Sequence, residues 1–209
     1  MLDHEYSVLG GINRARIGHL IGGLAAALGS ILITGIIAGL KLLERLNLID
    51  EVPNVILWPI TAGVIYAFLY WIFDNFLWKF GFLSDRLKVP NLSGQWKCRG
   101  QPINPDKTLG VLWNGEIHIT QSWDKVRVRL KGQQSNSNST SAAIIYDPID
   151  GFRLMYSYCN EPKAGEIGIS GHRGFAELTF DSGLLEAHGE YFNGQGRFTF
   201  GTLTLTKVA

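Results

Sequence analysis

Two long stretches without a charged side chain constrain this chain more than any other feature of its sequence. No Asp, Glu, Lys or Arg occurs from Ile17 to Leu40, which is 24 residues, or from Val52 to Phe73, which is 22. At a rise of ~1.5 Å per residue, a helix of either length crosses the ~30 Å hydrocarbon core of a bilayer. We therefore expect two transmembrane helices, over about residues 17–40 and 53–73, and the pattern excludes a simple soluble enzyme.

These stretches divide the chain into a membrane region and a globular domain. The short linker Lys41–Glu51 joins the two spans, so residues 1–89 are predicted to form a transmembrane hairpin. Residues 90–209 contain no long apolar run, and about 120 residues suffice for one domain with its own core. Two basic residues lie in the linker and five lie in the outer flanks. This excess predicts a multi-pass membrane protein with both termini, and so the domain, in the cytoplasm.

Small residues recur at every fourth position of the first span. Such a stripe allows helix backbones to approach closely where no hydrophobic effect drives their association. It predicts either self-association of the chain or packing against the second span. The stripe consists of Gly18, Gly22, Ala26, Ser30, Thr34 and Ala38.

After Pro90 the hydrophobic period changes to two, which is typical of strands. No helix-length apolar pattern separates the runs, so parallel βαβ units are excluded. Short turns between successive runs favour an all-β, eight-stranded antiparallel up-and-down barrel with room for one small ligand, and a two-sheet sandwich is the alternative. The eight runs are Gly94–Gln101, Gly115–Ser122, Lys125–Gly132, Ser137–Tyr146, Phe152–Cys159, Gly174–Phe180, Leu185–Phe192 and Arg197–Lys207.

Two details support a barrel that holds a ligand. The Gly94-Gln95-Trp96 sequence resembles the opening strand of lipocalin and avidin barrels, in which the Trp closes one end. Residues 133–141 (QQSNSNSTS) continue directly into a strand-like run, so we interpret them as a polar strand entering the pocket. The alternative for that segment is a flexible loop.

Composition excludes several classes of function. The formal charge of the chain is +1, so a basic surface for duplex nucleic acid is not expected. The two cysteines, Cys98 and Cys159, provide no disulfide framework. His118, His172 and His188 lack metal-ligand spacing, and no catalytic motif is present. We expect neither an enzyme nor a bound cofactor or metal.

Aromatic, amide and basic residues gather between positions 152 and 201. Tyr156, Tyr158 and Asn160 alternate, which places them on one face of a strand. Aromatic rings stack on bases, and a guanidinium pairs with phosphate oxygens. The competing interpretation is a barrel core with tyrosines at its rim. The candidate ligand-binding residues are Tyr156, Tyr158, Asn160, His172, Tyr191, Arg197, Ser139 and Arg129.

The order of these parts resembles one family of bacterial proteins. Two spans precede Leu92-Ser93-Gly94-Gln95-Trp96, the Ser-rich strand, the run from Tyr156 to Pro162 (YSYCNEP), His172-Arg173-Gly174 and Gly189-Glu190-Tyr191. This ordered set is similar to the two-transmembrane, β-strand-rich effectors of CBASS anti-phage systems, which are also called SMODS-associating effectors.

The resemblance implies a cytosolic barrel that binds a cyclic oligonucleotide, which we take to be a cyclic dinucleotide. It also implies that the ligand controls oligomerisation of the helices and disruption of the bacterial inner membrane, killing an infected cell. Whether the ligand activates or restrains the effector stays open, as do its bases and linkage, the size of the oligomer, and the choice between a pore and general membrane damage. The alternative functions are a membrane-tethered lipocalin-like carrier and a scaffold that binds no nucleotide.

Overall fold

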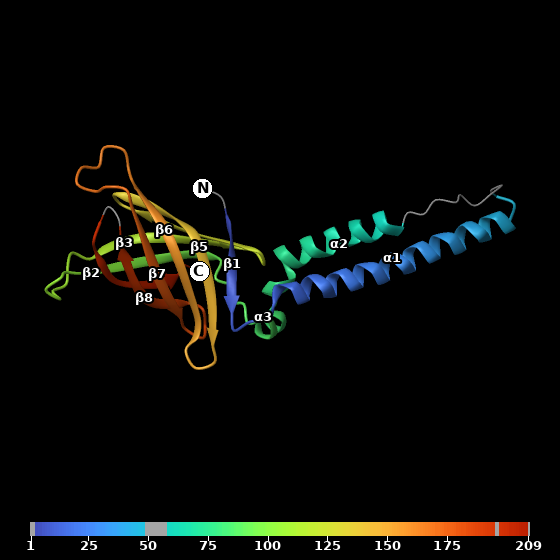
Figure 1. The fold of residues 1–209 in the computed structure, drawn as a ribbon, viewed down its shortest axis with the longest axis horizontal. Helices are drawn as coiled ribbons and strands as arrows, with labels where there is room; N and C mark the ends of the chain where they lie inside the picture. Colours follow the sequence, from blue (N-terminus) through green and yellow to red (C-terminus); the bar gives the residue numbers. More distant parts are fainter. Residues whose placement is uncertain (1–2, 49–57, 195–196, 209) are drawn as a thin grey trace. The chain divides into compact units, whose positions relative to one another are not determined.

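The computed structural model describes residues 3–48, 58–194 and 197–208, and Figure 1 shows their fold. The chain divides into two compact units. One comprises Met1–Ile12 and Trp78–Ala209, and the other comprises Asn13–Leu77. These bounds differ from the predicted domains 1–89 and 90–209, because the first residues of the chain belong with the strands and not with the helices.

Two long helices make up the second unit. Helix α1 (Arg14–Arg45) begins at Asn13, whose side-chain Oδ1 accepts a hydrogen bond from the Ala15 N–H at 2.9 Å and so satisfies a free donor of the first turn. Among the described helices, α1 has the length and apolar composition to cross a membrane, and it contains the first predicted span. Helix α2 (Trp58–Asn75) overlaps the second predicted span, whose expected start at Pro53 lies outside the described residues.

The small-residue stripe does not form a single face of α1. Successive steps of four residues turn by about 40° around a helix with ~3.6 residues per turn. The side of α1 that carries Ala25 and Gly29 is buried, and a Cβ added to Gly29 would lie 3.5 Å from Ala62 Cα of α2. Gly18, Gly22 and Ala26 are accordingly half-buried, whereas Ser30, Thr34 and Ala38 are exposed.

The described residues contain two short helices besides α1 and α2. A 3-10 helix η1 (Leu77–Lys79) and a third α-helix α3 (Gly81–Leu87) lie between α2 and β2 in the sequence, and α3 belongs to the unit that holds the strands. Lys88 ends α3 in the left-handed conformation with φ 56°, and Leu87 and Val89 are buried. The described residues therefore hold three α-helices where two were predicted, and the added helix α3, with seven residues, is too short to be a membrane span.

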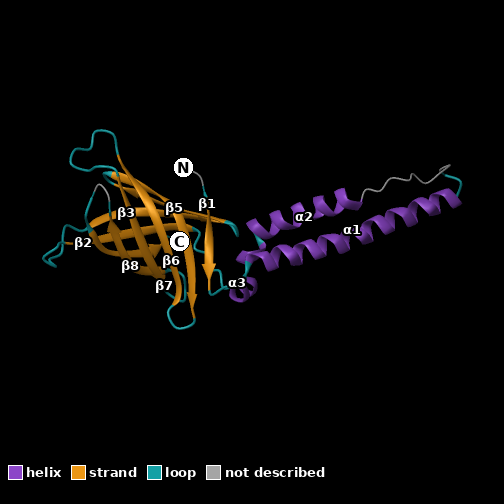
Figure 2. Ribbon diagram, viewed as in Figure 1, coloured by secondary structure: helices purple, strands orange, loops and turns teal. Residues whose placement is uncertain are grey.

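Apart from α3, the remaining unit is built of strands, and its sheet closes on itself in a barrel (Figure 2). Each of the eight predicted strands is present, with ends that shift by up to three residues, and a ninth strand was missed. The strands are β1 (His4–Leu9), β2 (Gly94–Ile103), β3 (Trp113–Gln121), β4 (Lys125–Gly132), β5 (Ser135–Asp147), β6 (Gly151–Pro162), β7 (His172–Phe180), β8 (Glu186–Asn193) and β9 (Phe200–Lys207).

Strand β1 corrects the predicted topology. Strands β4 and β5 pair directly over three residues on each side, 129–131 with 136–138. Beyond that point β1 enters between them, antiparallel to β4 and parallel to β5, with Tyr6–Leu9 opposite Ala142–Ile145. The barrel is thus nine-stranded and mixed, not a purely antiparallel up-and-down sheet of eight strands. Only four residues separate the end of β1 from the start of α1.

One end of the barrel is filled by apolar side chains. Trp96 is fully buried, donates its indole N–H to the Leu92 carbonyl at 3.1 Å, and packs edge-on against Phe180 with ring centroids 5.4 Å apart. Gln121 lies beside them and is hydrogen-bonded to the backbone N–H of Leu92. The predicted closure of one barrel end by Trp96 agrees with this packing, and we call this region the closed end.

Candidate ligand-binding site

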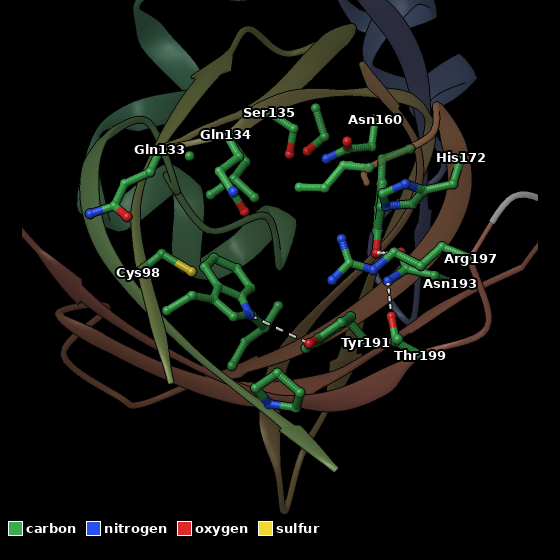
Figure 3. A pocket seen from close by; sticks show the side chains of 18 of the residues that line it. Cys98, Gln133, Gln134, Ser135, Asn160, His172, Tyr191, Asn193, Arg197 and Thr199 are labelled. Atoms are coloured by element: carbon green, nitrogen blue, oxygen red, sulfur yellow. Dashed lines mark hydrogen bonds between the residues drawn. The ribbon is translucent and has the colours of Figure 1, made fainter. Parts of the chain in front are cut away.

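A cavity of about 420 Å³ lies inside the other end of the barrel, which we call the open end. Figure 3 shows its lining side chains, which come from strands on all sides of the barrel and from the segments that join them. The volume falls in the range of ~300–1,000 Å³ that is usual for small-molecule sites. The barrel is therefore not a completely filled core.

Four aromatic side chains line the cavity. Tyr156 and Tyr158 follow one another on the inner face of β6 with ring centroids 6.0 Å apart. Trp113 of β3 meets Tyr191 of β8 nearly at right angles, with centroids 6.1 Å apart. Burial raises the pKa of all three tyrosine hydroxyls above the ordinary value of 10.0, so they are neutral at physiological pH and the rings offer stacking surfaces without negative charge.

Glycines on neighbouring strands make room for two of these rings. Gly174 is the register partner of Tyr158, and a Cβ at Gly174 would lie 2.5 Å from the Tyr158 ring. Gly100 is the register partner of Trp113, and a Cβ there would overlap the indole ring. The two aromatic side chains therefore lie over glycine backbone on the paired strand, which sets the positions of both rings at the cavity.

Hydrogen bonds hold Asn193 and Thr199, which lie at the two ends of the segment that carries Arg197. The Tyr158 hydroxyl donates to Asn193 Oδ1 at 2.8 Å, and Asn193 Nδ2 donates to Thr199 Oγ1 at 2.7 Å. The backbone N–H of Asn193 also donates to the Thr199 carbonyl at 2.7 Å. Asn193 thus joins both ends of this segment to a buried tyrosine on β6.

The cavity is electropositive. Arg197 contributes its guanidinium to the lining (Figure 3), and its charge acts to lower the pKa of Tyr158 and Tyr191 against the larger effect of burial. Among the described lining residues there is no carboxylate. A guanidinium in such a site suits an anionic group such as a phosphate.

Cys98 lies at the cavity wall as a neutral thiol. It is buried, and burial raises the pKa of its thiol from 9.0 to about 12. A thiol with so high a pKa forms almost no thiolate at neutral pH, so it is a poor nucleophile. Cys98 therefore serves as a packing residue of the barrel wall.

Six of the eight candidate residues line this cavity: Tyr156, Tyr158, Asn160, His172, Tyr191 and Arg197. Ser139 points into the barrel, but its hydroxyl lies 2.7 Å from His4 Nε2 and accepts from the Val128 N–H at 2.9 Å, away from the cavity. Arg129 is exposed, because it alternates with the inward-facing Val128 and Leu130 of β4. Neither belongs to the cavity lining.

Other lining residues were missed. Trp113 was not a candidate, although its pairing with Gly100 is the kind of large–small pair that marks a close approach between strands. Asn193 and Thr199 flank Arg197 and carry a polar pattern that could have been read together with it. The polar segment at residues 133–141 does enter the site, as predicted, because Ser135 and Ser137 of β5 line the cavity.

Comparisons with known proteins match both units. Residues 87–207 match a family model described as the cyclic dinucleotide receptor domain of Cap15, and residues 15–79 match the model described as the TM helices of Cap15. A curated protein of Yersinia aleksiciae, CD-NTase-associated protein 15, is 43% identical over 208 residues, which cover 100% of this chain and 99% of that protein. The two models describe a receptor domain and a membrane region rather than a catalytic domain.

Proposed function

The chain belongs to the Cap15 family of CBASS transmembrane effectors, and from that premise we propose that its barrel binds a cyclic dinucleotide in the open-end cavity. The bases stack on the aromatic side chains of β6, β3 and β8, and Arg197 contacts a phosphate. Binding shifts an equilibrium between assembly states of the membrane helices. In the assembled state the helices disrupt the inner membrane and kill the infected cell.

The observation that carries this proposal is the chemistry of the cavity. Aromatic rings surround a space whose described lining has one guanidinium and no carboxylate, and this lining lies within the part of the chain that matches the receptor domain. Rings and a basic group together are what a nucleotide requires of its site. An apolar carrier would instead need a uniformly apolar pocket, and buried Asn160 and His172 argue against that alternative.

On the membrane side we propose that α1 and α2 both span the bilayer and that the barrel is cytoplasmic. The excess of basic residues outside the predicted spans supports this orientation. Self-association uses the part of the small-residue stripe that the helix pair leaves open, at Ser30, Thr34 and Ala38. Small side chains at these positions allow a second copy to approach α1 closely.

The binding proposal is tested by calorimetric titration of the full-length protein in lipid nanodiscs with cyclic di-AMP and cyclic di-GMP. Arg197→Ala removes the phosphate contact and should weaken both ligands roughly ten- to a hundredfold, since a charge-assisted hydrogen bond contributes ~1.5–3 kcal/mol and ~1.4 kcal/mol is tenfold in affinity. Arg173→Ala is the matched control, because Arg173 is exposed on the outer face of β7. Equal effects of the two substitutions, or no binding by the parent protein, would refute the proposed site.

The membrane proposal is tested by expressing variants in growing cells. Thr34→Leu and Ala38→Leu keep α1 apolar, so insertion and protein level should hold while oligomers and membrane damage decrease. Gly39→Leu is the control, since position 39 faces about 140° away from position 34 and about 100° away from position 38 around the helix, and an added Cβ there meets nothing within 4 Å. Undiminished toxicity and oligomers in the Thr34 and Ala38 variants would show that this face does not mediate assembly. A protein that is harmless in every state would favour the carrier or scaffold.

A further inference from the structure

Five polar side chains are buried inside the barrel, and they differ in whether other groups of the protein provide their hydrogen-bond partners. Gln121 Oε1 accepts from the Leu92 N–H at 2.9 Å, and its Nε2 donates to the Tyr6 hydroxyl and the Pro90 carbonyl, both at 3.1 Å. Ser139 is bonded to His4 and Val128. Both groups have their partners within the fold. The other three are Ser137, Asn160 and His172.

Those three form a continuous row that we call the polar row. In the register of the sheet, Asn160 of β6 lies opposite Ser137 of β5 on one side and opposite His172 of β7 on the other. All three line the open-end cavity, and Figure 3 shows Asn160 and His172 side by side at its wall. The row therefore faces the space that a ligand would fill.

Asn160 has an unmet hydrogen-bonding requirement. Its side chain is 6% exposed, and its Oδ1 is buried without a hydrogen-bond partner. A buried acceptor without a donor is costly, and native proteins rarely retain one without a reason. A ligand that brings a donor to this atom would remove the cost.

His172 adds a second acceptor to the polar row. Its Nδ1 lies 3.0 Å from the Ser170 carbonyl oxygen. Because a carbonyl oxygen can only accept, Nδ1 carries the hydrogen, and the neutral ring presents Nε2 as an acceptor. The polar row thus offers two acceptors, Asn160 Oδ1 and His172 Nε2, beside the amide donor Asn160 Nδ2.

We infer that the polar row reads the edge of one base and selects an amino base, adenine foremost. This inference rests on the proposed cyclic dinucleotide site. An Asn amide pairs bidentately with the amino group of adenine and the adjacent ring nitrogen, and the second amino hydrogen can go to His172. Adenine has a ring acceptor on either side of its amino group, so the match holds for both orientations of the amide.

Other bases fit the polar row less well. Uracil has no amino group, so one of the two acceptors would stay unpaired. The amino group of guanine lies between the N1–H donor, which would oppose the amide donor of Asn160, and the ring acceptor N3, so guanine matches the amide on one side of its amino group where adenine matches on both. Selection among the bases therefore depends on the neutral amide of Asn160, which places a donor next to an acceptor.

The test exchanges that amide for a group that only accepts. Full-length protein in lipid nanodiscs is titrated with cyclic di-AMP, cyclic di-GMP and cyclic di-UMP, and the parent should bind cyclic di-AMP most tightly. Asn160→Asp should weaken cyclic di-AMP by ten- to a hundredfold, because a carboxylate repels the ring nitrogen. Cyclic di-GMP should lose less or gain, because guanine N1–H and its amino group both donate to a carboxylate. The order of the two ligands should invert.

Two further variants keep the inference falsifiable. Asn114→Asp places the same charge at an exposed lining position, so it should weaken all three ligands by a similar factor through repulsion of phosphate. Asn160→Leu removes the unpaired atom, so its melting temperature should equal or exceed that of the parent, while selectivity among the ligands is lost.

The outcomes separate this inference from the proposed function. Tightest binding of cyclic di-GMP or cyclic di-UMP by the parent, or equal losses for all three ligands in Asn160→Asp, would overturn base reading by the polar row and leave the nucleotide site standing. A lower melting temperature of Asn160→Leu would show that the amide has a structural partner. Failure of the parent to bind any of the three ligands would overturn both proposals.

Discussion

The two ends of the barrel use the same kinds of residue in opposite ways. At the closed end Trp96 is fully buried and bonded to backbone, and Gln121 has a protein partner for each polar atom. At the open end Trp113 is half-exposed over a cavity, and Asn160 keeps an acceptor without a partner. Trp96 and Gln121 therefore have their hydrogen-bond partners within the fold, whereas Asn160 does not.

Structural and ligand-binding residues differ at these two ends in their hydrogen bonds, although both kinds are buried. Burial alone does not distinguish Gln121 at 7% exposure from Asn160 at 6%. Satisfaction of hydrogen bonds does distinguish them. Substitutions at the closed end should therefore reduce stability, whereas matched substitutions at the open end should mainly change binding.

The largest difference in stability between the two ends is expected for substitutions of their tryptophans, Trp96 and Trp113. Trp96→Ala should lower the free energy of unfolding by about 3–5 kcal/mol, because a large buried side chain leaves a cavity. Trp113→Ala should cost less than about 2 kcal/mol, since the ring is half-exposed, but it should weaken nucleotide binding. Chemical denaturation followed by circular dichroism measures the first effect, and calorimetry the second. Equal losses of stability would remove the contrast between the ends.

The next largest difference in stability is expected between substitutions of the two buried amides, Gln121 and Asn160. Gln121→Leu leaves the Leu92 N–H and the Tyr6 hydroxyl without the partner they had, and should destabilise the barrel by about 1–3 kcal/mol. Asn160→Leu breaks no side-chain hydrogen bond that the described structure contains and removes an unpaired buried acceptor, so the stability should stay the same or rise. Thermal melts of both variants in the absence of nucleotide decide this. A larger loss at position 160 would contradict the comparison.

Alkaline pH should lower the folding stability of the barrel through the buried ionisable groups of the cavity wall. Cys98 and the tyrosines hold their protons more tightly in the folded state, because burial raises the pKa of the Cys98 thiol from 9.0 to about 12 and raises those of Tyr156 and Tyr158 above 10.0. Stability is therefore complete below pH 9 and falls above it by up to about 1.4 kcal/mol per pH unit and group. In Cys98→Ala the onset should move toward pH 10. A stability that is flat from pH 8 to pH 11 would argue against these buried groups.

The smallest expected effect concerns the segment that carries Arg197. Tyr158→Phe keeps the ring but removes the 2.8 Å hydrogen bond to Asn193. Loss of about 0.5–1.5 kcal/mol predicts binding weaker by roughly three- to tenfold. Tyr146→Phe is the control, since Tyr146 lies on β5 outside the cavity. An effect of Tyr158→Phe on stability without any effect on affinity would separate Tyr158 from the site.

Local sequence pattern predicted eight of the nine strands, because alternation and turn residues are local signals. Along β4, for example, Val126, Val128 and Leu130 alternate with charged residues, and Val126 and Val128 are buried while Leu130 is half-buried against the core. Strand β1 was missed, since six residues before an apolar helix show little periodicity and their partners lie far along the chain. The predicted end of the second span could be compared with α2, whereas its start at Pro53 lies outside the described residues.

The sequence predicted which residues of the candidate site face the inside of the barrel, but not which of them reach the cavity. Alternation assigns Tyr156, Tyr158 and Asn160 to the inside, and all three line the cavity. It also assigns Ser139 to the inside, but only the unpredicted β1 brings His4 within 2.7 Å of the Ser139 hydroxyl. Arg129 was a candidate for its charge, although its own alternation with Val128 places it outside. Tertiary pairing, which no local pattern encodes, decides which inward residues meet a ligand.

The position of β1 in the sequence also delays closure of the barrel while the chain is being synthesised. It precedes every other described element, yet the serine that its His4 contacts lies 135 positions later, beyond both long helices. At a synthesis rate of ~5–20 residues per second, β1 waits on the order of 10 s for its neighbours in the sheet. The helices are therefore complete before the barrel can close around its cavity. Chain order makes the membrane segment available to the insertion machinery before a finished ligand-binding domain exists.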